Sequence, residues 1–219
     1  MVKLCSGSEL GCKALLIASG VSYRKLDVPG ADRLQGCGVF YGSAMTEAMS
    51  CMNEDVYVVG GANSAGQAAM YFSKFARRVV MLVRGESLSA TMSHYLIDQI
   101  ARTPNIHVQT RTRVAELHGD SHLEALSIHC GETNQTEKVP THSLFVFIGA
   151  EPHTDWLAGV VERDARGFIY TGSDLLRSGK RPAGWTLERE PYLLETSVLQ
   201  SCNTRRYRFV GQPGGVCHS

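Results

Sequence analysis

One stretch constrains the fold of this 219-residue chain more than any other: VYVVGGANSAGQAAM, which begins at Val56. It opens with an apolar run that suits a buried strand, passes through two glycines, and continues into small and polar residues that suit a helix. A strand, a glycine-rich turn and a helix in direct succession are typical of a Rossmann-like unit. The sequence therefore predicts an α/β fold with a mostly parallel sheet.

The turn follows the Gly-x-Gly-x-x-Gly/Ala pattern of dinucleotide-binding folds, with Gly60, Ala62 and Ala65 at the three specified positions. Ala62 adds a methyl group where the backbone must approach a phosphate, which we expect to weaken binding by about 1 kcal/mol if its φ suits alanine. The N–H groups at the start of the next helix suit a pyrophosphate. A glycine-rich helix start that serves packing alone is the alternative. The predicted cofactor-binding residues of the turn are Gly60, Gly61, Ala62, Asn63, Ser64 and Ala65.

The next apolar strand, VVMLV, indicates which nucleotide is bound. An NAD-type site places an acidic residue after this strand to bind the ribose hydroxyls, whereas this chain places Arg84 there, followed by Gly85. Arginine pairs with the 2′-phosphate of NADPH, and the hydroxyls of Ser87 and Ser89 can bind the same group. Glu86 argues mildly for NADH. The pattern as a whole predicts NADPH.

Hydrophobic periodicity predicts the other elements of the chain. A buried strand is expected over residues 14–18, and a short helix or loop over 39–51. Strands are expected over 56–59 and 78–83, helices over 64–76 and 89–102, a meander of strands over 105–130, and a fully apolar strand from 143.

Composition excludes several classes of function. The formal net charge is +1, and no apolar run approaches the roughly 20 residues of a membrane span, so we expect neither nucleic acid nor a membrane as partner. The N-terminus lacks the apolar core of a signal peptide, which predicts a cytoplasmic protein. Seven cysteines include no C-x-x-C pair, and the histidines lack metal-ligand spacing. No tyrosine precedes a lysine by four residues, which argues against a short-chain dehydrogenase.

Several longer motifs, taken in order, resemble the thioredoxin-reductase-like flavoproteins among the pyridine nucleotide-disulfide oxidoreductases. They are ALLIASG, VPGAD, GVFYGSAMTEA, the glycine turn with its flanking strands, and FVFIGAEPHTDWL. The resemblance implies an FAD-binding domain interrupted by an NADPH-binding domain, with hydride passing from nicotinamide to flavin. It also implies a homodimer for the intact family member and allows a redox acceptor protein as its partner.

By this resemblance, residues 1–30 end a first FAD-domain segment, 31–140 form the NADPH-binding domain, and 141–198 begin a second FAD-domain segment. ALLIASG and FIGAEP, which contains Gly149, line the wall of the flavin site in the family. The family's glycine-rich turn for FAD and its Gly-Asp flavin motif are missing, and residues 199–219 match nothing in the family. We therefore expect a truncated or frame-disrupted chain that does not retain FAD.

Two departures from the family change the expected chemistry. Gly42 and Met45 stand where the family has the cysteines of its C-x-x-C dithiol, which excludes thioredoxin reduction through that site. Of three basic positions for the 2′-phosphate, only Arg84 is kept, and Gly85 and Ser89 occupy the others. The expected function is the NADPH-binding portion of an FAD-dependent oxidoreductase with another electron acceptor and no catalytic residue of its own. The alternative is a non-catalytic NADP(H)-binding module or an inactive fragment.

Overall fold

A computed structural model describes residues 2–3, 6–42, 51–176 and 180–198. The chain divides into two compact units, which are residues 23–149, and residues 1–22 together with 150–219. The first unit contains the whole of the predicted 31–140 span, with short additions at both ends. Met45 and the tail 199–219 lie outside the described residues.

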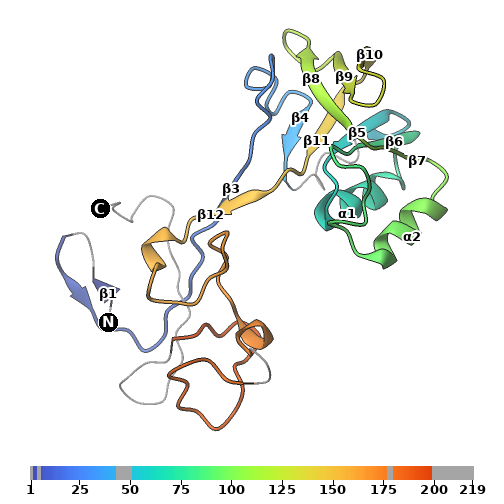
Figure 1. Ribbon diagram of the computed structural model, residues 1–219. Helices are drawn as coiled ribbons and strands as arrows, with labels where there is room; N and C mark the ends of the chain where they lie inside the picture. Colours follow the sequence, from blue (N-terminus) through green and yellow to red (C-terminus); the bar gives the residue numbers. More distant parts are fainter. Residues whose placement is uncertain (1, 4–5, 43–50, 177–179, 199–219) are drawn as a thin grey trace. The chain divides into compact units, whose positions relative to one another are not determined.

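A five-stranded parallel sheet forms the centre of the 23–149 unit, which confirms the predicted α/β class (Figure 1). Its strand order is β4-β11-β5-β6-β7. The strands are β4 (Val39–Tyr41), β11 (Ser143–Val146), β5 (Asp55–Val59), β6 (Arg78–Leu82) and β7 (Ile106–Gln109). β5 lies in the middle, so the glycine turn leaves the sheet from its central strand.

Both faces of this sheet are covered, which explains why its strands are continuous apolar runs rather than alternating ones. Val56 and Val58 pack in one core cluster with helices α1 (Asn63–Phe72) and α2 (His94–Arg102). Tyr57 and Val59 point to the other face, into a second cluster. An antiparallel sheet of β8 (Thr112–His118), β9 (Ala125–Cys130) and β10 (Gln135–Pro140) covers that face. The predicted meander is therefore confirmed for β8 and β9, whereas β7 belongs to the parallel sheet.

α1 ends at Phe72, four residues earlier than predicted, and a side chain from a distant segment accounts for the difference. The amide of Asn105 donates to the carbonyl oxygens of Ser73 and Ala76, at 2.9 and 3.2 Å. These bonds satisfy carbonyl groups at the helix end and hold residues 73–76 in a turn that leads into β6. The partner lies 29 residues or more along the chain, beyond the reach of local periodicity.

α2 begins at His94 rather than at the predicted residue 89. Two bonds hold the residues before it against the glycine turn. The Thr91 hydroxyl donates to the Gly61 carbonyl at 2.8 Å, and the Ser93 N–H donates to Asn63 Oδ1 at 2.8 Å. Residues 88–93 are therefore hydrogen-bonded to the glycine turn and are not part of the helix.

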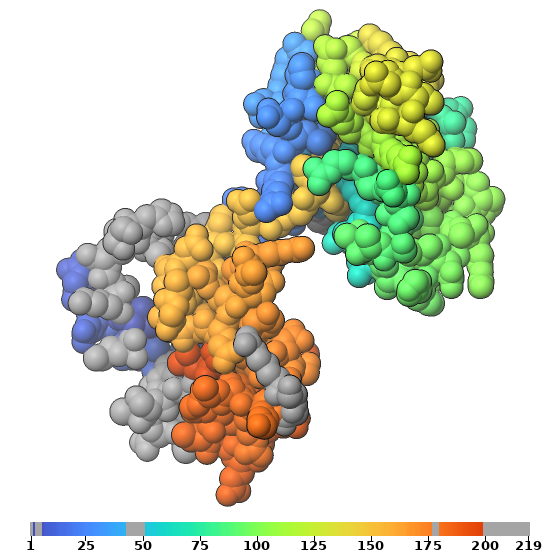
Figure 2. Space-filling view, viewed as in Figure 1, coloured from blue at the N-terminus to red at the C-terminus, as the bar shows by residue number. Residues whose placement is uncertain are grey.

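The unit of residues 1–22 and 150–219 has little regular structure in its described part. It contains an antiparallel pair, β1 (Val2–Lys3) and β2 (Glu9–Leu10), and the short 3₁₀ helices η2 (Asp155–Leu157) and η3 (Gly172–Leu175). β12 (Ala150–Pro152) pairs with β3 (Val21–Tyr23). Figure 2 shows the same segments in space-filling form.

The predicted buried strand over residues 14–18 is wrong. These residues are exposed to half-buried and form no strand. An apolar run becomes a strand only when a neighbour pairs with its backbone groups, and the described residues supply no such neighbour here. Neither helix of the described part has the length and apolar character that a membrane span requires.

Candidate functional site

Gly60 makes the tight turn at the carboxyl end of β5, and only glycine fits there. Its φ is +142°, and its N–H donates to the Leu82 carbonyl at 3.1 Å. A Cβ at this position would lie 2.6 Å from the Phe147 carbonyl oxygen and 2.9 Å from the Ala65 Cβ. The backbone of residue 147, just beyond β11, and the first turn of α1 therefore meet at a residue that has no side chain.

Ala62 occupies its position without strain, although the motif specifies glycine there. It is the N-cap of α1, with φ −101° and ψ 176°, a conformation open to any residue. Its side chain is exposed. The extra methyl group therefore leaves the backbone of the turn undisturbed, and its effect is limited to the space in front of it.

The start of α1 presents several backbone donors. The first bond of the helix runs from the Gly66 N–H to the Ala62 carbonyl at 3.1 Å, so the N–H groups of Asn63, Ser64 and Ala65 have no acceptor within the helix. No acidic side chain lies in the first turn. These donors and the positive end of the helix dipole make a site suited to an anion.

The residues predicted after β6 form an exposed loop beside the turn. Arg84, Ser87 and Ser89 are all exposed, and the two serine hydroxyls lie 2.8 Å apart. β5 and β6 are neighbouring parallel strands, so this loop and the Gly60 turn leave the same edge of the sheet. Ligands of α/β sheets bind at this carboxyl edge.

Gly149 lies three residues beyond the end of β11, the other neighbour of β5. Its φ is +107°, and its carbonyl accepts the Arg24 N–H at 3.0 Å. A Cβ there would meet only Arg24 Cδ, at 3.8 Å, so the glycine is required by its backbone angle rather than by lack of space.

Gly42, which takes the place of a family cysteine, lies against an aromatic ring. It is buried, its φ is +79°, and its N–H donates to the Val146 carbonyl at 3.3 Å. A Cβ at Gly42 would lie 2.6 Å from both Cε atoms of the Tyr23 ring. A thiol at residue 42 would therefore need both a strained backbone and a displaced Tyr23. No sequence pattern indicated this contact.

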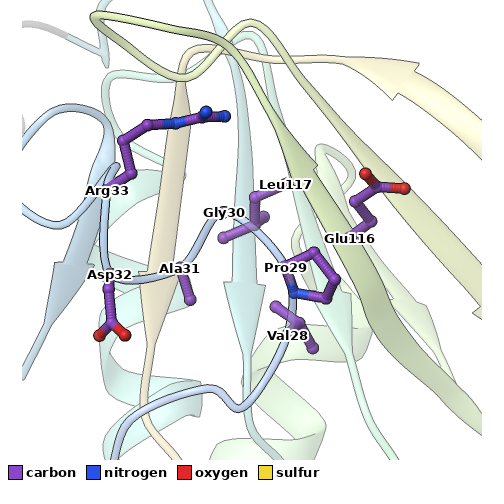
Figure 3. A pocket seen from close by; sticks show the side chains of 8 residues that line it. All are labelled: Val28, Pro29, Gly30, Ala31, Asp32, Arg33, Glu116 and Leu117. Carbon is purple, nitrogen blue, oxygen red and sulfur yellow. The ribbon is translucent and has the colours of Figure 1, made fainter.

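A shallow cavity of about 540 Å³ lies elsewhere in this unit, between residues 28–33 and the strand β8 (Figure 3). Among its lining residues, the Pro29 carbonyl accepts the Leu117 N–H at 2.9 Å, and Arg33 donates to the Gly119 carbonyl at 2.7 Å. Figure 3 shows the carboxylates of Asp32 and Glu116 pointing in different directions. We assign it no chemistry, because its charged groups do not converge. The part of the chain that the structure describes also contains no cluster of three metal-ligating side chains.

The parallel sheet, the glycine turn and the helix start together define a Rossmann-like α/β unit. The chain belongs to the pyridine nucleotide-disulphide oxidoreductase family, whose profile matches residues 2–178. Within that family it is thioredoxin-reductase-like, as its relatives and structural neighbours agree.

Curated relatives include a thioredoxin reductase of Streptomyces clavuligerus, 29% identical over 173 residues, which cover 79% of this chain and 53% of the relative. One component of the alkyl hydroperoxide reductase of Staphylococcus epidermidis is 31% identical over 79% of this chain, but only 34% of that protein is matched. The chain thus spans about half the length of the thioredoxin reductase it matches, and a smaller share of the longer relative.

Solved structures agree with these relatives. The thioredoxin reductase of Giardia duodenalis superposes with a TM-score of 0.65 at 26% identity, over 72% of this chain and 51% of that one. The thioredoxin reductase of Streptococcus pyogenes gives a TM-score of 0.63 at 26% identity, over 72% and 51%. Both matches support the fold class that the sequence predicted.

Proposed function

We propose that this chain is the NADPH-binding portion of a thioredoxin-reductase-like, FAD-dependent oxidoreductase. The observation that carries the proposal is the turn at Gly60. Its positive φ and the 2.6 Å approach of the Phe147 carbonyl leave no room for a side chain, and donors of α1 follow directly. The N–H groups at the start of α1 that lack an acceptor within the helix follow this turn at the carboxyl edge of the sheet, where ligands of α/β folds bind.

Six of the predicted residues contact the cofactor in this proposal. The N–H groups of Asn63, Ser64 and Ala65 bind the pyrophosphate, while the Asn63 side chain is engaged with Ser93. Arg84 pairs with the 2′-phosphate, and Ser87 and Ser89 add hydroxyl donors. When bound, NADPH supplies a hydride. The residues named here bind and orient the cofactor.

The electron acceptor is reached by a route other than a dithiol at residues 42 and 45. Gly42 carries no thiol, and the Tyr23 ring lies where one would project. For the intact protein we propose, from family kinship, a homodimer that passes electrons to a redox acceptor protein or a small molecule.

The fit to FAD is poorer than the fit to NADPH. In the family a second glycine-rich turn holds the FAD pyrophosphate. The described residues of the 1–22 and 150–219 unit contain no α-helix whose N-terminus could do so. The same observation favours a second candidate function, a module that binds NADP(H) without turning it over.

Two substitutions in the turn test the proposal because they are expected to act in opposite directions. Gly60→Ala places a methyl group against the Phe147 carbonyl and should weaken NADPH binding by roughly tenfold or more, about 1.4 kcal/mol. Ala62→Gly removes a methyl group that stands where the backbone must approach the phosphate. It should strengthen NADPH binding about fivefold, or ~1 kcal/mol.

Titration calorimetry with NADPH measures both effects, and circular dichroism checks that each variant is folded. Equal affinities for the unsubstituted chain and both folded variants would rule out the turn as the pyrophosphate site. No binding of NADPH or NADH to the unsubstituted chain would refute the proposed function itself.

A further inference from the structure

Arg84 and Arg111 leave the sheet side by side, although they are far apart in sequence. Leu82 of β6 pairs with Gln109 of β7, and each arginine lies two residues beyond its strand's last pair. The ladder continues past the strand ends, because the Val83 N–H donates to the Gln109 carbonyl and the Arg111 N–H donates to the Gly85 carbonyl, both at 2.9 Å. Arg111 is therefore anchored to the loop in which the 2′-phosphate is proposed to bind.

The backbone of Arg111 is fixed from two sides. Its φ is +51°, in the left-handed region that residues with a Cβ seldom adopt. Its carbonyl accepts the Gly131 N–H at 2.8 Å, in addition to the bond with Gly85. These bonds fix the backbone position from which the Arg111 side chain extends.

The group that Arg111 pairs with is Glu86, the one carboxylate among residues 84–89. Its Nη2 lies 3.0 Å from Glu86 Oε1, and its Nη1 lies 4.0 Å from Glu132 Oε1. The Arg111 side chain is 46% exposed and that of Glu86 80% exposed. Such an exposed ion pair contributes little to the free energy of unfolding. We expect it to act instead by reducing the negative charge that a bound ligand would experience beside Glu86.

We propose that Arg111 is a positioning residue that occupies and neutralises Glu86, and so allows a 2′-phosphate to bind beside Arg84. A free Glu86 would repel the phosphate and would offer an acceptor to the 2′-hydroxyl of NADH. The inference rests on the proposed NADPH site. It explains how one arginine suffices when Gly85 and Ser89 occupy the two other basic positions.

Four variants of the full chain test this, with dissociation constants for NADPH and NADH measured by calorimetry at low and high salt. Arg111→Ala should lower the NADPH-to-NADH affinity ratio about five- to tenfold, an effect that weakens in high salt. Adding Glu86→Gln to that variant should restore the ratio, and Arg111→Lys should preserve it. Arg113→Ala, which removes an exposed arginine of β8, is the matched control and should leave the ratio unchanged.

The alternatives give different results. A loss in Arg111→Ala that Glu86→Gln does not reverse would mean that Arg111 contacts the phosphate itself, and would overturn the positioning role. An equal loss for both cofactors would mean a structural role and would overturn it as well. If the unsubstituted chain binds NADPH and Arg111→Ala binds it equally well, the inference fails while the proposed function stands.

Discussion

Gly60 and Ala62 stand two residues apart in one turn but have opposite conformational demands. Gly60 has φ +142° and is pressed against Phe147, whereas Ala62 has an ordinary extended backbone and an exposed side chain. The motif positions are therefore not equivalent. The departure at residue 62 leaves the turn intact, and the same substitution at residue 60 would not.

Replacing Gly42 by cysteine is expected to destabilise the protein rather than restore a thiol site. The φ of +79° and the overlap with Tyr23 predict a loss of about 1–3 kcal/mol in the free energy of unfolding. Urea denaturation measures this loss. In a Tyr23→Ala background, Gly42→Cys should cost less stability than it does in the unsubstituted chain, because the ring that the new side chain would overlap is absent. Full stability of the single variant would contradict the prediction.

Arg84 is expected to discriminate between the two nicotinamide cofactors. Arg84→Ala should weaken NADPH binding by about 1.5–3 kcal/mol and leave NADH binding nearly unchanged, because only NADPH carries the 2′-phosphate. Calorimetry with both cofactors checks this, and an equal effect on both would show that the arginine serves the structure of the loop.

At the scale of elements, helix α1 lies close to α2 because of a further glycine within the helix. A Cβ at Gly66 would come within 2.6 Å of Leu96 Cδ2 and 2.8 Å of Met92 Cε. Ion pairs connect the amino-terminal ends of β5 and β6, at the edge of the sheet away from the glycine turn. Asp55 accepts hydrogen bonds from Arg77 and Arg78, and its side chain is only 13% exposed.

The Asp55 contacts predict an acid-sensitive contribution to stability. Burial raises the pKa of Asp55, but the hydrogen bonds and charges of Arg77 and Arg78 outweigh it and hold that pKa below its usual value near 3.8. Because the folded pKa is the lower one, the contribution is complete above the unfolded pKa and is lost as pH falls through the folded value.

Asp55→Asn should therefore lower the free energy of unfolding by about 1 kcal/mol at neutral pH, allowing for solvent screening. The variant should approach the unsubstituted chain as the pH falls below about 4. Urea denaturation from neutral pH down to roughly pH 3 tests this. A deficit that is constant with pH would show that the ion pairs are not its source.

At the scale of the molecule, the two units differ in what they bury. The 23–149 unit has two core clusters, one on each face of its sheet. The other unit leaves large apolar side chains exposed in its described part, among them Leu16, Val160, Phe168 and Leu193. Exposed apolar surface of this kind favours association.

We predict that the chain by itself retains no flavin and does not turn over NADPH. Flavin chemistry needs the flavin ring held against the nicotinamide, and the described residues offer a single turn suited to a pyrophosphate. The test is to purify the chain with excess FAD, desalt it and record the visible spectrum, with NADPH calorimetry on the same sample as the control for folding. A stoichiometric yellow protein that oxidises NADPH with a dye acceptor would overturn the prediction.

Local pattern was sufficient for the α/β class, the central strands and the glycine turn. Apolar periodicity and turn chemistry act between residues close in sequence, so they can be read from the sequence alone. The same locality explains the failures. An apolar run at 14–18 has no strand partner among the described residues, and both helices are shortened by bonds from distant segments.

Only the tertiary structure decided which distant side chains meet. Tyr23 lies against Gly42 although 19 positions separate them in the chain, and Arg111 reaches Glu86 across 25. The second contact depends on two strand ends being brought to the same edge of a sheet. Strand order is set by the packing of the whole core, because several orders satisfy the same local patterns.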